Sequence, residues 1–306
     1  MRFAAMRPAF HRPESVAQAC ELLAANRRAI PYAGGTAIEI RRRQDPSFDP
    51  VLVDLSRVPF LDRLDRLDRL DRLDRLGSHG RDRGGLRVGP MVTIRRMAKD
   101  PLVAQVVPLA AAAYAAAYAA AGNPRVSNAA TVGGSLAHGA DRLDPPAALV
   151  VLGAVIEVTS IRAVRRIAAA DFFVSGRRTL LEPGDVVTAM QIPAAPAGSA
   201  ASYVRRCGPG AQEWPCASAA AVLLREGDGR RRLRLGIGAL GEVPGLAELD
   251  LASAREDGAV AAALDAAERL MDPVPGAWGS VSYRRAQGRV AVEDAVRRAW
   301  READRD

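Results

Sequence analysis

The stretch ATVGGSLAHG (residues 130–139) has the same build as YAGGTAIEI (residues 32–40), which lies 99 positions earlier when counted from Gly34 to Gly133. In both, apolar residues run into a Gly-Gly pair, a hydroxyl residue follows, and the next residues suit a helix. Glycines let backbone N–H groups converge on a ligand, and a helix start adds partial positive charge. One such turn is common in hairpins. Two of the same build predict two anionic groups or one diphosphate, and hence a dinucleotide.

Two common nucleotide-binding motifs are missing from the chain. No G-x-G-x-x-G follows the first predicted strand, which excludes the usual Rossmann arrangement. No G-x-x-x-x-G-K-[ST] is present either, so a P-loop nucleotide hydrolase is excluded as well.

Length and composition indicate an ordinary globular protein. The 306 residues, 49% of them hydrophobic, predict two domains or one domain with subdomains. No run of 18 apolar residues exists, so we expect no membrane span. The three cysteines are Cys20, Cys207 and Cys216, far apart and without a C-x-x-C motif, which suits reduced thiols and a cytoplasmic location.

The net charge of +8 raises the possibility of a nucleic-acid partner. The basic residues are almost all arginine, with Lys99 as the only lysine, and they are scattered along the chain. Only 5% of residues are aromatic, which leaves few rings to stack on bases. We therefore expect no nucleic-acid partner.

Hydrophobic patterns predict an α+β chain. We expect a helix over 15–27 capped by Ser15, then strands at 29–35 and 51–58, then a strand, turn and helix over 84–98. We expect one Ala-rich helix over 101–123, a helix and strand over 145–160, and a strand that ends at Pro193. After a small, Pro-containing stretch at 193–202, the pattern predicts sheet at 217–227 and 231–240, with helices at 260–271 and 290–300. These elements divide into domains of 1–195 and 200–306, and the first has subdomains of about 1–58 and 59–195.

A perfect tripeptide repeat, LDRLDRLDRLDRLDRL, occupies residues 61–76. A period of three moves each leucine about 60° round an α-helix, so the leucines make no core stripe. Five Asp and five Arg cancel, so the repeat is not the source of the net charge. We interpret it as a low-complexity insertion in a surface loop. The alternative is an exposed, partner-binding helix supported by pairs such as Asp62–Arg66.

Four stretches, two of which contain the glycine blocks, resemble a known family. They are GNPRVSNAATVGGSLAHGADRLDPPAAL, FFVSGRRTLLEPGDVVTAMQIP, AGGTAIEI and GSVSYRRAQGRVAVEDAVRRA. They resemble the FAD-binding, or medium, subunit of molybdenum hydroxylases, the group that includes the carbon monoxide and xanthine dehydrogenase types. The resemblance covers nearly the whole chain. It implies a two-subdomain FAD-binding fold of the PCMH (vanillyl-alcohol-oxidase-like) type, followed by a C-terminal α/β domain like that of carbon monoxide dehydrogenase flavoproteins.

The resemblance implies a set of FAD-binding residues. In the first loop they are Ala33, Gly34, Gly35, Thr36, Ala37 and Ile38, and in the second loop Thr131, Val132, Gly133, Gly134 and Ser135. Outside the loops they are Asn123 of a G-N-P turn, Asp144 near the ribityl chain, Val187 beside the flavin, and Arg205 where the family usually has lysine.

The chain departs from the family pattern at four places, one of which is GIGALGEVPG (residues 236–245), a loose match to the family's sheet motif. Ala37 replaces a residue that is commonly polar, and the usual H-A-D-P block appears as His138-Gly139-Ala140-Asp141. The tripeptide repeat stands where the family has a short strand linker.

The resemblance implies a role in electron transfer. It predicts FAD held without a covalent bond, a 2Fe–2S small subunit and a molybdopterin large subunit as partners, and an acceptor such as NAD or a quinone. The sequence itself has no cysteine cluster for an iron–sulfur centre, no metal-ligand spacing and no G-x-S-x-G nucleophile, so we expect no catalytic or metal-binding residues. Two alternatives remain open: a stand-alone FAD-dependent oxidase of the same fold, and a flavin-free basic scaffold protein.

Several single residues have a structural interpretation beside the functional one. His138 is expected to be a hydrogen-bonded structural residue. Asp144 could cap the next helix or contact the cofactor, and Tyr203 could pack in the core or against the flavin. Trp214 and Cys216 are expected in the core.

Overall fold

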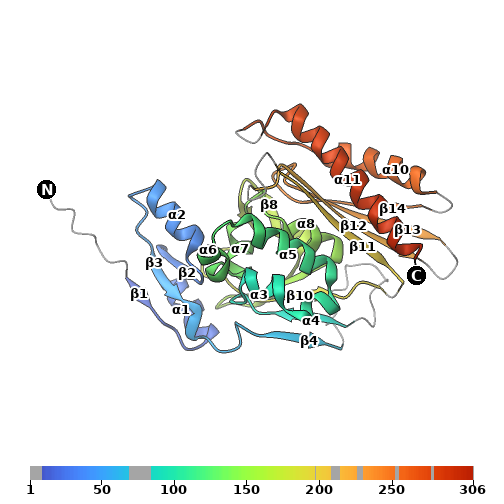
Figure 1. The fold of residues 1–306 in the computed structure, drawn as a ribbon. Coiled ribbons are helices and arrows are strands. Elements are labelled where there is room, and N and C mark those ends of the chain that lie inside the picture. Colours follow the sequence, from blue (N-terminus) through green and yellow to red (C-terminus); the bar gives the residue numbers. More distant parts are fainter. Residues whose placement is uncertain are drawn as a thin grey trace.

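The computed structural model describes residues 9–68, 84–196, 198–207, 214–225, 230–251, 255–276 and 279–305. Figure 1 shows a small N-terminal sheet with two helices in blue, a central sheet with green helices beside it, and a C-terminal sheet with two red-orange helices. Within the described residues, no helix is long and apolar enough to cross a membrane.

The N-terminal unit is a small parallel α/β layer. Its elements are β1 (Phe10–His11), α1 (Val16–Ala25), β2 (Ala29–Tyr32), α2 (Thr36–Gln44) and β3 (Val51–Asp54), with strand order β1-β3-β2. Both strand pairs are parallel, so a helix must connect consecutive strands. The predicted cap is confirmed, because the Ser15 side chain accepts a hydrogen bond from Gln18 N at 3.1 Å.

The central sheet has the order β4-β5-β10-β6-β7, and all neighbours are antiparallel. Its strands are β4 (Leu64–Leu67), β5 (Gly85–Val88), β6 (Val155–Thr159), β7 (Val164–Ala168) and β10 (Val186–Pro193). The helices of this region are α3 (Ile94–Lys99), α4 (Pro101–Val106), α5 (Pro108–Ala120), α6 (Pro124–Ala129), α7 (Val132–His138) and α8 (Pro145–Leu152). The short elements α9 (Ala169–Phe172), β8 (Phe173–Ser175) and β9 (Arg178–Thr179) precede β10. Leu86 and Ile156 face the helices and join the largest hydrophobic core, whereas Arg87 and Glu157 lie on the opposite face.

The Ala-rich segment is two helices, so the prediction of one continuous helix was wrong. α4 ends at Val106 and α5 begins at Pro108, with Val107 between them at φ −139° and ψ 64°. Proline has no N–H to donate, and it disfavours the helical conformation of the preceding residue. The pattern of apolar residues continues through this break, which is why it predicted a single helix.

The start of the tripeptide repeat is a strand, and the surface-loop interpretation was wrong there. Leu64–Leu67 forms β4 and pairs with β5, with Leu64 opposite Val88. Leu61 and Leu64 are buried and belong to two different hydrophobic clusters. The helix alternative is also wrong for these residues. Repeat residues 69–76 lie outside the described residues.

The C-terminal part is an antiparallel meander covered by helices. Its elements are β11 (Ala200–Arg206), β12 (Ala217–Arg225), β13 (Arg231–Gly238), β14 (Gly245–Asp250), α10 (Glu256–Leu270) and α11 (Val281–Ala303). The helix α8 approaches the sheet closely at Gly236, where an added Cβ would lie 2.3 Å from the Ala147 carbonyl oxygen. β10 ends at Pro193 and β11 starts a new sheet at Ala200, while the domain limits themselves stay a prediction.

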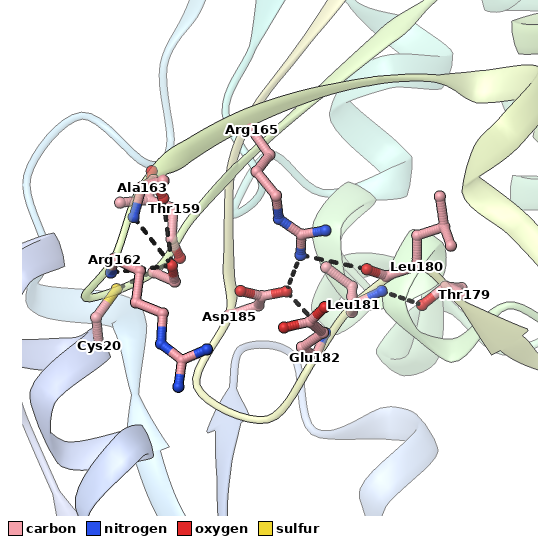
Figure 2. A network of polar contacts seen from close by, with 11 residues as sticks. Cys20, Thr159, Arg162, Ala163, Arg165, Thr179, Leu180, Leu181, Glu182 and Asp185 are labelled. Atoms are coloured by element: carbon pink, nitrogen blue, oxygen red, sulfur yellow. Dashed lines mark hydrogen bonds and ion pairs between the residues drawn. The ribbon is translucent and has the colours of Figure 1, made fainter.

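Polar contacts surround the turn before β10, and one further hydrogen bond joins the N-terminal unit to the central sheet (Figure 2). The Asp185 carboxylate accepts hydrogen bonds from the Arg165 guanidinium and, at 2.7 Å, from Glu182 N. Arg165 also donates to the Leu180 carbonyl at 3.3 Å. On the side of α1, the Cys20 thiol donates to the Thr159 carbonyl at 3.4 Å. These contacts fix the turn before β10 and the end of β6 beside α1.

Candidate cofactor site

The first glycine block ends in a helix start whose N–H groups are available. Gly35 is the N-cap of α2, at φ 71°, and no side chain caps this helix. The first helical hydrogen bond runs from Glu39 N to Gly35 O at 2.9 Å. The N–H groups of the three residues 36–38 therefore have no partner within the helix, and the described contacts give them none elsewhere. A free helix N-terminus of this kind suits an anion such as a phosphate.

Gly35 must be glycine for two reasons. Its φ lies in the left-handed region, which other residues rarely adopt. A Cβ at this position would also lie 2.6 Å from the Tyr32 hydroxyl oxygen.

The second glycine block has a different geometry, so the prediction of two equal Gly-Gly turns was wrong. Gly133 and Gly134 lie inside the first turn of α7, whose N-cap is Thr131. The N–H groups of this turn donate hydrogen bonds to other atoms of the protein. Val132 donates to Val92 O at 2.9 Å, Gly133 donates to Pro90 O at 2.8 Å, and Gly134 donates to the Thr131 hydroxyl at 3.1 Å. The free backbone donors therefore come from the first block alone.

The two glycines of the second block face different surroundings. A Cβ on Gly133 would lie 2.4 Å from the Cβ of Pro90, so this position is closed by protein. A Cβ on Gly134 would meet only the Thr131 hydroxyl oxygen, at 3.0 Å, and Gly134 is exposed. Gly134 therefore leaves an open backbone surface beside the helix start, which a ligand can approach closely.

The structure brings the two blocks together. A Cβ built on Gly34 would lie 1.8 Å from the Ala129 carbonyl oxygen and 3.2 Å from the Ala130 Cα. The first block thus sits directly on the connection between α6 and α7. Ala130 also accepts a hydrogen bond from Ile94 N at 2.9 Å, which fixes this connection to α3. The free N–H groups of α2 and the start of α7 consequently belong to one region of the molecule.

A second predicted group converges where α8 meets the C-terminal sheet. The Asp144 carboxylate is 2% exposed, accepts a hydrogen bond from the Tyr203 hydroxyl at 2.6 Å, and lies 3.2 Å from Arg205 Nε. Asp144 makes no capping hydrogen bond to α8, so the capping interpretation was wrong. Burial raises the pKa of Asp144 to about 6, although Tyr203 and Arg205 act in the opposite direction.

Sequence analysis missed a fourth residue of this region, Arg142. Its buried guanidinium donates to the Trp214 carbonyl at 2.8 Å and twice to the Pro215 carbonyl, at 2.9 and 2.8 Å. It therefore holds the segment before β12 against the loop between α7 and α8. No local pattern distinguishes this arginine from the many exposed ones. Trp214 itself is 38% exposed, so its predicted place in the core was wrong, while the burial of Cys216 is confirmed.

The remaining predicted residues lie apart from these two groups or have structural partners. The Asn123 side chain caps α6 by accepting a hydrogen bond from Arg125 N at 2.9 Å. Val187 is buried in β10, in the same core as Val132. Burial, followed by the charge of Arg177, lowers the pKa of His138, so its imidazole is neutral at pH 7.

Comparison with known proteins identifies the family. Residues 3–195 match the family described as "FAD binding domain in molybdopterin dehydrogenase". The medium subunit of nicotine 6-hydroxylase from Paenarthrobacter nicotinovorans is 30% identical over 299 residues, covering 95% of each chain. The carbon monoxide dehydrogenase medium chain of Hydrogenophaga pseudoflava is 27% identical, covering 95% of this chain and 96% of the relative.

Solved structures agree with this result. The chain superposes on reconstituted CO dehydrogenase from Oligotropha carboxidovorans with a TM-score of 0.82, at 26% identity, covering 96% of this chain and 98% of that one. It superposes on quinoline 2-oxidoreductase from Pseudomonas putida 86 with a TM-score of 0.81, at 27% identity, covering 99% of both chains. The expected PCMH-type fold class is therefore confirmed.

The site fits an FAD on the structure's own evidence, since the free N–H groups at the start of α2 can donate to a phosphate and Gly134 leaves backbone accessible. With the family match and two chains aligned over nearly their whole length, the conclusion is plain: the chain belongs to the FAD-binding family of the molybdopterin dehydrogenases and is an oxidoreductase subunit.

Proposed function

We propose that the chain is the FAD-binding electron-transfer subunit of a multi-subunit molybdenum hydroxylase. In this role it receives electrons from a 2Fe–2S small subunit, which takes them from a molybdopterin large subunit. It then passes them to an acceptor such as NAD or a quinone. The observation that carries the proposal is the uncapped N-terminus of α2 lying against the α6–α7 connection, in a chain whose relatives are medium subunits.

Different residues would bind the diphosphate and the flavin end of FAD. The N–H groups at the start of α2, with the Thr36 hydroxyl, would hold the diphosphate, because they are donors at the positive end of a helix. Gly134 and Ser135 would bound the other side of the diphosphate. Ala37 adds no side-chain donor there.

Asp144 and Arg205 would hold the ribityl and flavin end. Tyr203 donates to the Asp144 carboxylate and fixes its orientation, and Arg205 stabilises its charge. The bound flavin can pass electrons one or two at a time, and the protein's part is to place it and adjust its surroundings.

Co-expression with candidate iron–sulfur and molybdenum subunits tests this proposal. We expect the three chains to co-purify and to reduce a dye acceptor with a purine, an aldehyde, an N-heterocycle or carbon monoxide as donor. The isolated chain should show only slow transfer from a chemical reductant to the dye.

The two alternatives give different results in the same experiment. Oxidation of an organic substrate by the isolated chain, at the rate of the complex, would support a stand-alone oxidase and contradict the proposal. A colourless chain that still assembles would support the flavin-free scaffold.

A further inference from the structure

A cavity of about 450 Å³ lies on the face of the central sheet opposite its helices. Its floor is formed by Arg87, Glu157, Thr159 and Thr188, and the N-terminal residue Val16 of α1 closes one side. The helix α7, which contains the second glycine block, packs into the core on the other face of the sheet. The lining contains no residue of the two glycine blocks and none of the group around Asp144.

The cavity floor contains a β-bulge in β10, and the bulged residue is Thr188, whose side chain lines the cavity. The pairing of β10 with β6 shifts register between Val187 and Ala189, which leaves Thr188 as the extra residue of a β-bulge. The Thr188 hydroxyl lies 3.1 Å from Glu157 Oε1 and 3.1 Å from the Thr159 hydroxyl. Bulges occur often beside functional sites, where they redirect a side chain.

The cavity rim contains a strained aromatic residue. Phe60 has a φ of 68°, in the left-handed region that a bulky residue rarely adopts. Its side chain is 62% exposed, so burial does not compensate for this conformation. The Arg63 guanidinium lies over the ring, 4.1 Å from its centroid. A strained residue that the core does not require indicates a functional position.

The charges of the lining balance. Burial raises the pKa of Glu157, but Arg87, Thr188 and Arg166 outweigh it and hold this pKa below the usual value. Glu157 is therefore ionised and paired with Arg87 at 3.1 Å. On β4 and the turn before it, Arg63 and Asp65 add one charge of each sign. The four charges of the lining therefore sum to zero, and a ligand with a net charge meets no net charge of opposite sign there.

We propose that this cavity is a second ligand site, which binds an uncharged one- or two-ring aromatic molecule bearing both hydrogen-bond donors and acceptors. The ring lies against Phe60 and its apolar neighbours Pro59 and Val16, while the polar groups reach Thr159, Thr188 and the Glu157 carboxylate. A volume of about 450 Å³ suits a molecule of this size.

Ligand-observed NMR and calorimetry on the full, flavin-containing chain test this site with 2-pyridone, phenol and benzamide as probes. We expect these neutral probes to bind with dissociation constants of about 1 to 10 mM, as fragments do. Benzoate and benzylamine, which have similar rings with a net charge, should bind at least about tenfold more weakly.

Two variants and two matched controls localise the binding. T188V, which removes the hydroxyl and keeps the shape, and F60G should each weaken the neutral probes about tenfold or more. F60G should also raise the thermal midpoint, because glycine adopts a positive φ without strain. T179V and V174G, on β9 and β8, should leave probe binding unchanged, and V174G should lower the midpoint because glycine weakens a strand.

Three results would overturn the proposal. One is that none of the neutral probes binds at about 20 mM, a concentration that saturates ordinary fragment sites. Another is that binding survives in both T188V and F60G. The third is that the charged probes bind as tightly as the neutral ones.

Discussion

The Cα of Gly34 lies so close to Ala129 that a Cβ on Gly34 would stand 1.8 Å from the Ala129 carbonyl oxygen. This contact seats the N-terminal unit on the connection between α6 and α7. It also sets the place of the α2 N-terminus relative to α7. Two sequence segments almost a hundred residues apart thereby come together in one region of the molecule.

Gly34→Ala should separate these segments. No real contact of a Cβ is as short as the one it would make, and the neighbour is backbone, so something must shift. We expect FAD affinity to fall at least about tenfold and the thermal midpoint to fall with it. Equilibrium titration with FAD and thermal unfolding measure the two effects. Gly241→Ala is the control, since its Cβ would make only ordinary contacts, the shortest at 3.5 Å from the Val243 carbonyl oxygen, and it should leave FAD affinity and thermal midpoint unchanged.

Gly133 and Gly134 should respond differently to substitution. Gly133→Ala meets Pro90 and should lower the thermal midpoint. Gly134→Val meets only the Thr131 hydroxyl oxygen and should abolish flavin binding while the far-UV circular dichroism stays that of the parent. Normal flavin content in Gly134→Val would remove the second block from the site.

Asp144 should make stability depend on pH. The pKa of Asp144 in the folded chain is about 6, above the ordinary value of 3.8. The stability that this difference adds to the folded chain is therefore fully present below about pH 3.8 and is lost as the pH rises through about 6. Asp144→Asn does not titrate. Between about pH 3.5 and pH 7 the unfolding free energy of the parent should fall relative to Asp144→Asn by roughly 3 kcal/mol.

Denaturant unfolding of both proteins across this range measures the difference. A constant gap between them would mean that Asp144 titrates normally in the folded chain.

The repeat should tolerate shortening beyond β4. Deletion of residues 68–73 removes two repeat units and keeps Leu64–Leu67, so flavin content and thermal midpoint should stay nearly unchanged. Leu64→Ala in the full repeat removes a buried side chain and should cost about 2 to 5 kcal/mol. Equal losses in the two variants would show that the whole repeat is structural.

Sequence patterns predicted the family and many of the helices and strands, but not β4, β11 or β14, nor the contacts that build the site. Ser15 was predictable because a cap is a local interaction. The helix break before Pro108 is also a local effect, because proline disfavours the helical conformation of the residue before it. The apolar pattern continues through the break and therefore predicted a single helix. The contacts of Gly34 with Ala129 and of Asp144 with Tyr203 join residues far apart in the sequence. The spacing of apolar residues within one segment does not predict such contacts. The same holds for Arg142, whose carbonyl partners lie more than seventy residues away.

A titration of the flavin-free chain with FAD and with riboflavin, followed by flavin fluorescence, tests the role of the α2 N-terminus most directly. If the α2 N-terminus holds the diphosphate, FAD should bind at least about 100-fold more tightly than riboflavin, which has no phosphate. Acid precipitation of the complex should then release all the flavin into the supernatant, because the bond is not covalent. Equal affinity for FAD and riboflavin, or no binding of FAD, would contradict the assignment of this site.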